Sequence, residues 1–214
     1  MINPTFCIIE KIDITYLKGD LTKDKLKHYI DTFKKYNFAS LCIPIAYLND
    51  IKEFNIDKDK KITTVIGFPF GYDNIDFKVF QLEKANFYGC DEYDFVFNIS
   101  KFLDKDYKYI YNELKTARKL TFNKTLKIIV ETCYLSKTEI LDAVNIIIDT
   151  GCDYVKTSTG FAHAGAKIED ILLIKDKFRD KIKIKASGGI KDIKTAIAMI
   201  DAGADRLGIS DVSF

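Results

Sequence analysis

The sequence predicts a single α/β domain over residues 1–214, folded as a (β/α)8 TIM barrel with a short or missing last helix. Two observations predict this fold class. Short β-branched or apolar runs alternate with helical spacings, and eight such runs occur without a linker or a break in composition. An open doubly wound sheet is the structural alternative, but it usually has fewer strands and a Gly-rich first turn. The sequence contains no G-x-G-x-x-G or Walker-type loop.

Each expected strand is a short apolar run, and successive runs are separated by about the length of one strand–helix unit. In chain order, the strands are expected at residues 12–14, 40–43, 63–67, 94–97, 126–131, 154–157, 182–185 and 206–208.

Between these strands, apolar side chains recur at helical spacing. Helices are expected around residues 26–33, 107–117, 140–148 and 193–200. Ser136 and Glu139 form the pattern of a capping box at a helix start, and Gly151 and Gly203 lie where glycine commonly ends a helix. The chain stops at Phe214, shortly after the eighth strand, so the final helix is expected to be absent or a single turn.

The composition excludes several classes of protein. Hydrophobic residues make up 47% of the chain and charged residues 30%, which suits a folded core with a solvated surface. No apolar run reaches the roughly 18 residues of a membrane span, and the N-terminal residues do not resemble a secretory signal. The 33 basic and 31 acidic residues are interleaved, so no nucleic-acid partner is expected.

Cysteine usage indicates a reducing compartment. The five cysteines are scattered and form no C-x-x-C pair, which argues against a zinc ribbon or a redox dithiol. We therefore expect a cytoplasmic protein without a metal site.

Polar residues at the carboxyl ends of strands carry the functional prediction, because barrels of this class collect functional groups there. Three stand out: Asp94 in DEYDFVFN, Lys156 in DYVKTSTGF and Lys185 in IKIKASGG. Lys156 is expected inside the barrel mouth, where desolvation lowers the pKa of an amine and makes it a nucleophile for carbonyl groups. Lys185 follows one strand–helix unit later, so its charge disfavours protonation of Lys156. Asp94 is expected to face across the mouth as an acid or base.

Several separated motifs, all in the same order, resemble those of the deoxyribose-phosphate aldolases, which are class I (Schiff-base) aldolases. The resemblance runs from Ile12 to about Ser210. It rests on the segments IDITYL, FASLCI, VIGFPFG, DEYDFVFNI, LKIIVETCYL, VKTSTGF and KASGGI. A set of ordered motifs is more specific than any single short pattern.

The resemblance implies reversible cleavage of 2-deoxy-D-ribose 5-phosphate to D-glyceraldehyde 3-phosphate and acetaldehyde, in deoxynucleoside catabolism. It implies that Lys156 forms the Schiff base, that Lys185 perturbs the pKa of Lys156, and that Asp94 and Asp13 join the proton relay. It implies no metal and no cofactor, a small sugar phosphate as partner, and a homodimer or higher homo-oligomer. We interpret the carboxylates other than Asp94 and Asp13 as ordinary helix surface.

Phosphate binding is expected on the loops after the seventh and eighth strands. Gly188 and Gly189 fit the first loop, because glycine allows a close backbone approach, and Gly208 and Ser210 fit the second. The remaining substrate-binding candidates are Thr15, Cys42, Phe68, Thr159 and Gly160. Two of them have simpler interpretations as well, Cys42 as a small buried hydrophobe and Phe68 as rim packing.

The sequence departs from the family at the phosphate loops. Asp211 stands where a second serine is typical, and Phe161 stands where some members have a lysine. Asp211 either repels the phosphate or caps the remnant of the last helix, and we favour the capping interpretation. Two alternative functions follow: a Schiff-base aldolase or lyase for an unphosphorylated aldehyde, or a non-catalytic barrel that binds a sugar phosphate.

Overall fold

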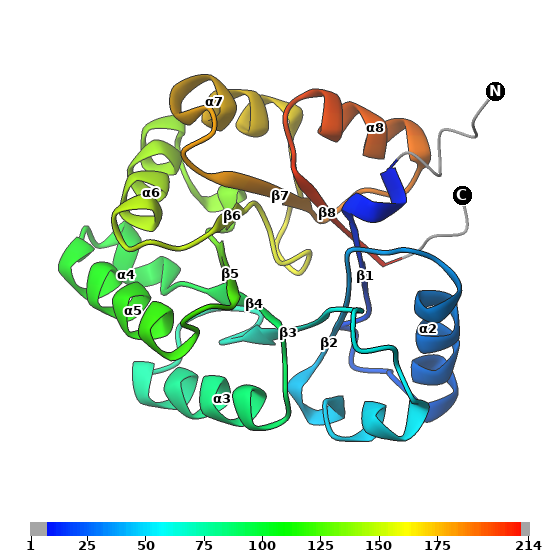
Figure 1. Cartoon of the computed structure of the whole chain (residues 1–214). Helices are drawn as coiled ribbons and strands as arrows, with labels where there is room; N and C mark the ends of the chain where they lie inside the picture. Colours follow the sequence, from blue (N-terminus) through cyan, green and yellow to red (C-terminus); the bar gives the residue numbers. More distant parts are fainter. Residues whose placement is uncertain (1–7, 211–214) are drawn as a thin grey trace.

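The computed structural model describes residues 8–210, which form a closed barrel of eight parallel strands in the order β1-β2-β3-β4-β5-β6-β7-β8 (Figure 1). The (β/α)8 barrel predicted from the sequence is therefore confirmed. The strands are β1 (Ile12–Thr15), β2 (Ser40–Ile43), β3 (Ile62–Ile66), β4 (Glu92–Val96), β5 (Thr125–Ile129), β6 (Tyr154–Lys156), β7 (Lys183–Ser187) and β8 (Arg206–Ile209).

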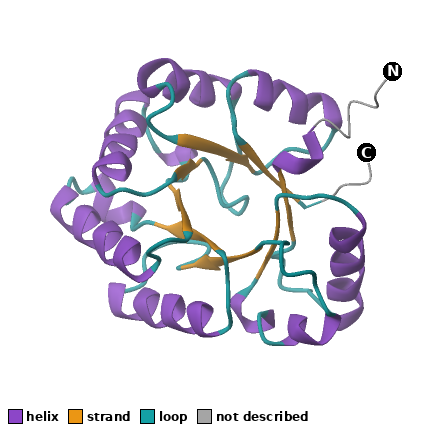
Figure 2. Cartoon of the chain, in the orientation of Figure 1, coloured by secondary structure: helices purple, strands orange, loops and turns teal. Residues whose placement is uncertain are grey.

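Helices surround the barrel on its outside (Figure 2). They are α2 (Lys23–Lys35), α3 (Ile75–Phe87), α4 (Ile99–Leu103), α5 (Tyr107–Leu120), α6 (Lys137–Asp149), α7 (Ile168–Phe178) and α8 (Ile193–Asp201). Four 3-10 turns complete the described chain: η1 (Ile9–Lys11), η2 (Ile45–Tyr47), η3 (Asp50–Phe54) and η4 (Thr132–Tyr134). The expected last helix would lie beyond residue 210, outside the described residues.

Predicted helix boundaries agree with the structure where capping residues define them. At the start of α6, the Ser136 hydroxyl accepts from the Glu139 backbone N–H and the Glu139 carboxylate accepts from the Ser136 backbone N–H. Gly151 and Gly203 follow α6 and α8 with φ of 75° and 112°. These are backbone conformations that glycine adopts without a steric penalty.

A tripeptide that occurs three times fixes the register of neighbouring strands near their amino-terminal ends. Gly-Cys-Asp or Gly-Ala-Asp precedes β4, β6 and β8, and each aspartate pairs with the first or second residue of the strand before it. The carboxylates of Asp91, Asp153 and Asp205 accept the N–H groups of those residues at 2.8–2.9 Å. Because each aspartate N–H also donates to the carbonyl of the same residue, the two contacts set the strand register.

Helix α3 was not predicted from the sequence, because its exposed and buried residues do not follow the usual pattern of polar and apolar side chains. The side chains of Phe77, Phe80 and Phe87 are exposed, whereas Lys78 is completely buried. The Lys78 ammonium donates to the carbonyl oxygens of Gly71 and Val96 and pairs with Glu113 on α5 at 2.7 Å. Part of the buried face of α3 is therefore an ion pair instead of apolar side chains.

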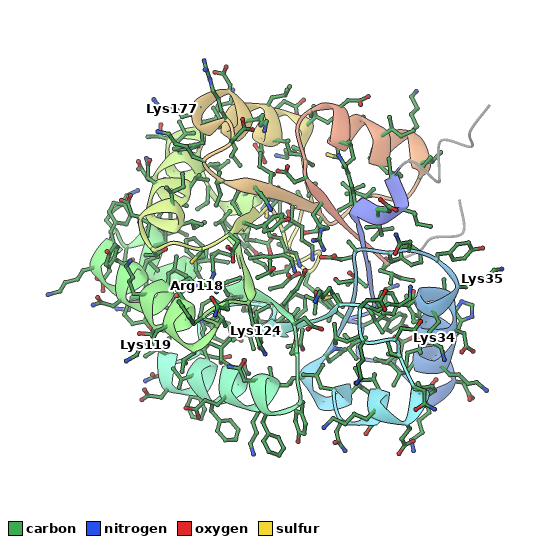
Figure 3. The ribbon with its side chains drawn as sticks, in the orientation of Figure 1. Lys34, Lys35, Arg118, Lys119, Lys124 and Lys177 are labelled. Carbon is green, nitrogen blue, oxygen red and sulfur yellow. The ribbon has the colours of Figure 1, made fainter. Side chains whose placement is uncertain are left out.

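The charged surface is distributed over the helices. In Figure 3, Lys34 and Lys35 lie on α2, Lys119 on α5 and Lys177 on α7, and all four side chains are exposed. Within residues 8–210, no helix has the length and apolar character needed to cross a membrane.

Candidate active site

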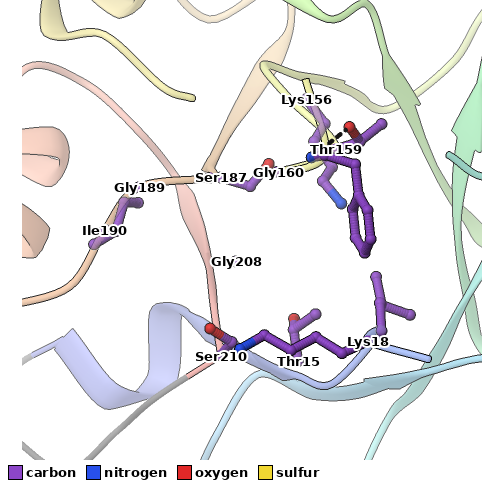
Figure 4. Close-up of a pocket in the computed structure, with 13 residues that line it drawn as sticks. Thr15, Lys18, Lys156, Thr159, Gly160, Ser187, Gly189, Ile190, Gly208 and Ser210 are labelled. Atoms are coloured by element: carbon purple, nitrogen blue, oxygen red, sulfur yellow. Dashed lines mark hydrogen bonds between the residues drawn. The ribbon is translucent and has the colours of Figure 1, made fainter. Parts of the chain in front are cut away.

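A cavity of about 240 Å³ opens at the carboxyl ends of the strands (Figure 4). Lys156 at the end of β6 lines it, together with the loops after β1, β6, β7 and β8. The lining residues are Thr15, Leu17, Lys18, Lys156, Thr159, Gly160, Phe161, Ser187, Gly188, Gly189, Ile190, Gly208 and Ser210. The position is the one at which barrels of this class place their functional groups.

Beneath this cavity, the four side chains predicted to carry the chemistry lie in contact. Lys156 Nζ is 2.8 Å from Asp94 Oδ2, and Lys185 Nζ is 2.6 Å from the same oxygen. Lys185 also pairs with Asp13 Oδ2. The strand register produces this cluster, since Lys156 and Lys185 are directly opposite each other on β6 and β7. All four side chains are buried.

Lys127 is a member of the cluster that sequence reasoning missed. It lies opposite Asp94 in the register of β4 and β5, and its ammonium is 3.1 Å from Asp94 Oδ1 and 2.6 Å from Glu92 Oε2. Asp13 Oδ2 is 3.7 Å away. A signal was present in the sequence: Lys127 stands between Leu126 and Ile128 and interrupts an otherwise apolar run.

Arg206 on β8 completes the network by bonding Asp13 Oδ1 at 2.6 Å and approaching Glu92 Oε2 at 3.4 Å. Three carboxylates therefore meet three cations before Lys156 is counted. The carboxylates are Asp13, Glu92 and Asp94, and the cations are Lys127, Lys185 and Arg206. Because this set is already balanced, the network does not require a charge on Lys156.

The two catalytic candidates on neighbouring strands have opposite pKa shifts. Burial lowers the pKa of Lys156, the Lys185 charge lowers it further, and the opposing attraction of Asp94 does not restore it. Burial also acts to lower the pKa of Lys185, but attraction from Asp13 and Asp94 outweighs burial and raises it. The expected effect of Lys185 on Lys156 thus has the predicted direction, and burial is the larger cause.

The Asp94 and Asp13 carboxylates both have lowered pKa values. Burial would raise the pKa of Asp94, but Lys127, Lys156 and Lys185 outweigh burial and hold that pKa well below its usual range. For Asp13, burial is likewise outweighed by Lys185, Lys127 and Arg206, and the pKa is lowered. A carboxylate beside a lysine of lowered pKa can accept a proton and return it.

The interpretation of all other carboxylates as helix surface was wrong for three of them. Glu92 lies inside the barrel on β4. Glu113, on the buried face of α5, pairs with Lys78, and Glu131 follows β5 with 2% of its surface exposed. Each has a cation or a set of hydrogen-bond donors within reach, which is the condition for burying a charged group. Charge alone, read along the sequence, does not reveal such partners.

Glu131 holds one wall of the cavity in place through hydrogen bonds. Its backbone has a positive φ of 52°, and its carboxylate accepts from both the N–H and the hydroxyl of Thr159. The Thr159 hydroxyl in turn accepts from the Phe161 N–H at 3.1 Å. This chain of bonds fixes the turn after β6, which carries Thr159 and Gly160 into the cavity wall.

Most predicted binding residues line the cavity, and two do not. Thr15, Thr159, Gly160, Gly188, Gly189, Gly208 and Ser210 are in its wall. Phe68 instead contacts Phe161 edge-on, with ring centroids 5.2 Å apart. Cys42 is completely buried on β2, and burial raises the pKa of its thiol to about 11, so it packs as a small neutral side chain. Asp211 lies outside the described residues.

Metal ligation has no preformed geometry in the described part of the chain. Within residues 8–210, no three His, Cys, Asp or Glu side chains are grouped so that they could hold a metal ion. The acids of the cluster are instead occupied by lysine and arginine partners.

A closed parallel barrel with a buried lysine–carboxylate cluster below an open cavity is the arrangement of a lysine-dependent barrel enzyme. Residues 7–210 match the model of the DeoC/LacD family aldolases. The chain belongs to this family.

Curated relatives and solved structures agree with this assignment. The chain is 43% identical over 206 residues to a deoxyribose-phosphate aldolase of Caldicellulosiruptor saccharolyticus, covering 95% of this chain and 94% of that protein. It is also 43% identical to the enzyme of the same name from Finegoldia magna, covering 93% of each chain. Among solved structures, an aldolase designated QR15 superposes with a TM-score of 0.91 at 38% identity, covering 98% of this chain and 92% of that one.

Proposed function

We propose that the protein is a class I aldolase that reversibly cleaves 2-deoxy-D-ribose 5-phosphate into D-glyceraldehyde 3-phosphate and acetaldehyde. One observation carries the proposal: the Lys156 amine is almost completely buried, lines an open cavity and has a lowered pKa. An amine of this kind is a better nucleophile for an aldehyde than an ordinary surface lysine, because more of it is unprotonated at a given pH. The names and the extent of the curated relatives support the choice of substrate.

The reaction begins at C1 of the open-chain sugar. Lys156 Nζ attacks the aldehyde carbon and forms a carbinolamine, which loses water to give a protonated imine. The imine nitrogen then withdraws electrons from the C2–C3 bond. The new charge on nitrogen lies close to Asp94, whose carboxylate is 2.8 Å from the amine in the free protein and stabilises it.

Cleavage requires one proton to leave and one to enter. As the C2–C3 bond breaks, the C3 hydroxyl loses its proton and becomes the aldehyde of D-glyceraldehyde 3-phosphate, and an enamine remains on Lys156. Protonation of C2 regenerates an imine, and water releases acetaldehyde. Asp94 is the proposed acid and base. Lys185, which is bonded to both Asp94 and Asp13, connects the two carboxylates and is proposed to help reset the protonation of Asp94.

The phosphate end of the substrate is assigned to the opposite side of the cavity. Gly188 and Gly189 have φ of 82° and 79°, a turn in which successive backbone N–H groups form a concave donor surface for anions. Support also comes from the position of this turn after β7, where barrels of this class commonly bind phosphate.

The proposal includes a cytoplasmic location, a role in deoxynucleoside catabolism and a homo-oligomeric assembly. A solved deoxyribose phosphate aldolase from Aeropyrum pernix, described as a unique tetramer, is 25% identical over 98% of this chain with a TM-score of 0.89. That relative supports self-association and leaves the number of subunits to be measured.

Reductive trapping tests the proposal. With acetaldehyde and borohydride, the wild-type protein should gain the mass of one ethyl group on Lys156, because borohydride reduces the imine. The Lys156→Ala variant should gain none and should lose cleavage of deoxyribose 5-phosphate. As a matched control, Lys167→Ala removes an exposed lysine of the neighbouring loop and should be trapped normally. Trapping of the Lys156→Ala variant at normal yield would show that another amine is the nucleophile.

A further inference from the structure

One cation of the cavity wall has no role in the chemistry described above. Among the cavity-lining residues that the structure describes, Lys18 and Lys156 are the two with cationic side chains. In Figure 4, the side chain of Lys18 extends along the side of the cavity opposite Lys156, past Thr15 and toward Ser210. Lys18 follows β1 and is exposed to solvent.

The acid nearest to Lys18 in sequence is already paired. Asp20 forms an ion pair with Lys25, and Tyr16 donates its hydroxyl to Asp20 Oδ1 at 2.7 Å. No ion pair or hydrogen bond of the Lys18 ammonium is found within residues 8–210. Its charge therefore faces the cavity without a counter-ion, whereas Asp13 and Asp94 below are neutralised by other cations.

The turn that carries Lys18 is anchored on both sides. The Tyr16 N–H donates to the Cys42 carbonyl at 3.0 Å, and the Tyr16 ring packs edge-on against Tyr29 with centroids 5.0 Å apart. On the other side, Asp20 is held by Tyr16 and Lys25. The backbone of Lys18 is thus fixed at the cavity edge, so that binding an anion requires ordering only its side chain.

Neutral donors lie in the same cavity. The N–H groups of Gly188, Gly189 and Ile190 have no acceptor within the described residues, and the Ser210 side chain is in the same wall. A phosphate monoester is a dianion, and it binds best where hydrogen-bond donors and a full positive charge converge. The donors come from the loops after β7 and β8, and Lys18 supplies the charge from the loop after β1.

We propose that Lys18 is the cation that binds the phosphate group of the substrate and that it determines the preference for phosphorylated over unphosphorylated sugars. This inference rests on the proposed function, because it assumes a sugar phosphate in the cavity. It assigns the charge of the phosphate site to the loop after β1, whereas the glycine turn follows β7.

The test compares Lys18→Met and Lys18→Arg with the wild type. For each protein, kcat/KM is measured with deoxyribose 5-phosphate and with deoxyribose, and the ratio of the two values is the readout. Lys18→Met should lower this ratio about tenfold or more, mainly through KM for the phosphorylated sugar, and Lys18→Arg should restore most of it. Lys58→Met removes an exposed lysine that does not line the cavity and should leave the ratio at the wild-type value.

Direct binding of inorganic phosphate separates this inference from the proposed function. Calorimetric titration should give a Kd about tenfold higher for Lys18→Met than for the wild type. If the wild type binds phosphate through Lys18 but cleaves no deoxyribose 5-phosphate, the proposed function is wrong and the role of Lys18 stands. An unchanged Kd together with an unchanged substrate ratio in Lys18→Met would overturn the role of Lys18 alone.

Discussion

The number of carboxylate partners separates two buried lysines that lie side by side. Lys185 contacts both Asp13 and Asp94, whereas Lys156 contacts Asp94 alone. Both amines are buried, and attraction from the second carboxylate is the main difference between the lysine with the raised pKa, Lys185, and the one with the lowered pKa, Lys156. This difference agrees with the proposed roles, in which Lys156 is the nucleophile and Lys185 stays charged beside it.

Removing Lys185 should therefore change the pH dependence of the reaction. In Lys185→Leu, the pKa of Lys156 should rise, because a repelling charge is lost and Asp94 keeps one lysine partner fewer to share its attraction. The neutral amine then forms only at higher pH, so the acidic limb of kcat/KM should move to more alkaline values. Lys183→Leu, an exposed change on the same strand, should leave the limb in place. A lower plateau with an unmoved limb would mean that Lys185 acts as a hydrogen-bond donor instead.

An active-site residue can be identified from the sequence when its place along the chain is unusual for its residue type. Lys156, Lys185 and Asp94 were found because each is a charged residue in or at the end of a strand, beside apolar neighbours. Glu92 and Lys127 are recognised only when the barrel brings them to their partners: Lys127 lies opposite Asp94 in the register and bonds Glu92. Lys18 is one of many exposed lysines in sequence, and its unpaired state depends on Lys25 binding Asp20.

Among the elements, α3 and α5 are joined to the barrel by the buried Lys78–Glu113 pair. Lys78 holds the carbonyls of Gly71 and Val96, and Glu113 accepts the Asn98 N–H at 2.9 Å. The pair thus connects two helices, the loop after β3 and the end of β4, the strand that carries Asp94. Burial lowers the pKa of Lys78 and raises that of Glu113, so each depends on the other for its charge.

Breaking this pair should be costly. Lys78→Met leaves a buried carboxylate without its cation and should lower the free energy of unfolding by about 3–5 kcal/mol, measured by urea denaturation. Lys84→Met changes an exposed lysine of the same helix and should stay within about 0.5 kcal/mol of the wild type. The double variant Lys78→Met with Glu113→Leu should recover part of the loss. A loss below about 1 kcal/mol for Lys78→Met would show that water or backbone donors replace the ammonium.

Strands were easier to predict than helices because each contains buried apolar residues within a short run of the sequence. Helices α2, α5, α6 and α8 have an apolar face at regular spacing, and this face was visible in the sequence. In α3, the buried ion pair and the exposed phenylalanines remove that spacing. No single-residue pattern encodes a lysine whose partner is 35 residues away on another helix.

Across the whole molecule, barrel closure brings the two ends of the described chain together. Asp13 on β1 is next to Gly208 on β8 in the strand register, and it bonds Arg206 of the same strand. The count of eight strands predicted closure, but it did not predict that a charge pair spans the seam. The contact between β1 and β8 that closes the barrel therefore includes an ion pair that requires the buried Asp13 to be ionised.

Acid should destabilise the protein through this network. The pKa values of Asp13 and Asp94 are lowered in the folded state, whereas unfolded aspartates titrate near about 3.9. The unfolded chain therefore binds more protons on acidification, so the stabilisation is complete above about pH 5 and decreases as the pH falls toward the folded-state values. The free energy of unfolding should decrease by at least about 1.4 kcal/mol per pH unit below about pH 4.

Urea titrations at a series of pH values measure this slope. Asp13→Asn should show a shallower slope than the wild type, while Asp149→Asn, an exposed change on α6, should keep the wild-type slope. Parallel slopes for all three proteins would place the acid sensitivity outside the barrel interior.

The balance of three carboxylates against three cations also determines whether the enzyme exchanges a proton with the surrounding buffer during the reaction. In the proposed reaction, a neutral amine becomes a positively charged imine, so the barrel interior gains one charge when the sugar is captured. Asp13 and Asp94 raise the pKa of Lys185, so Lys185 keeps its own proton and does not give it up to the imine. The proton is therefore drawn from the surrounding buffer and is given back when acetaldehyde departs, so that the resting interior is neutral at the start and end of every turnover.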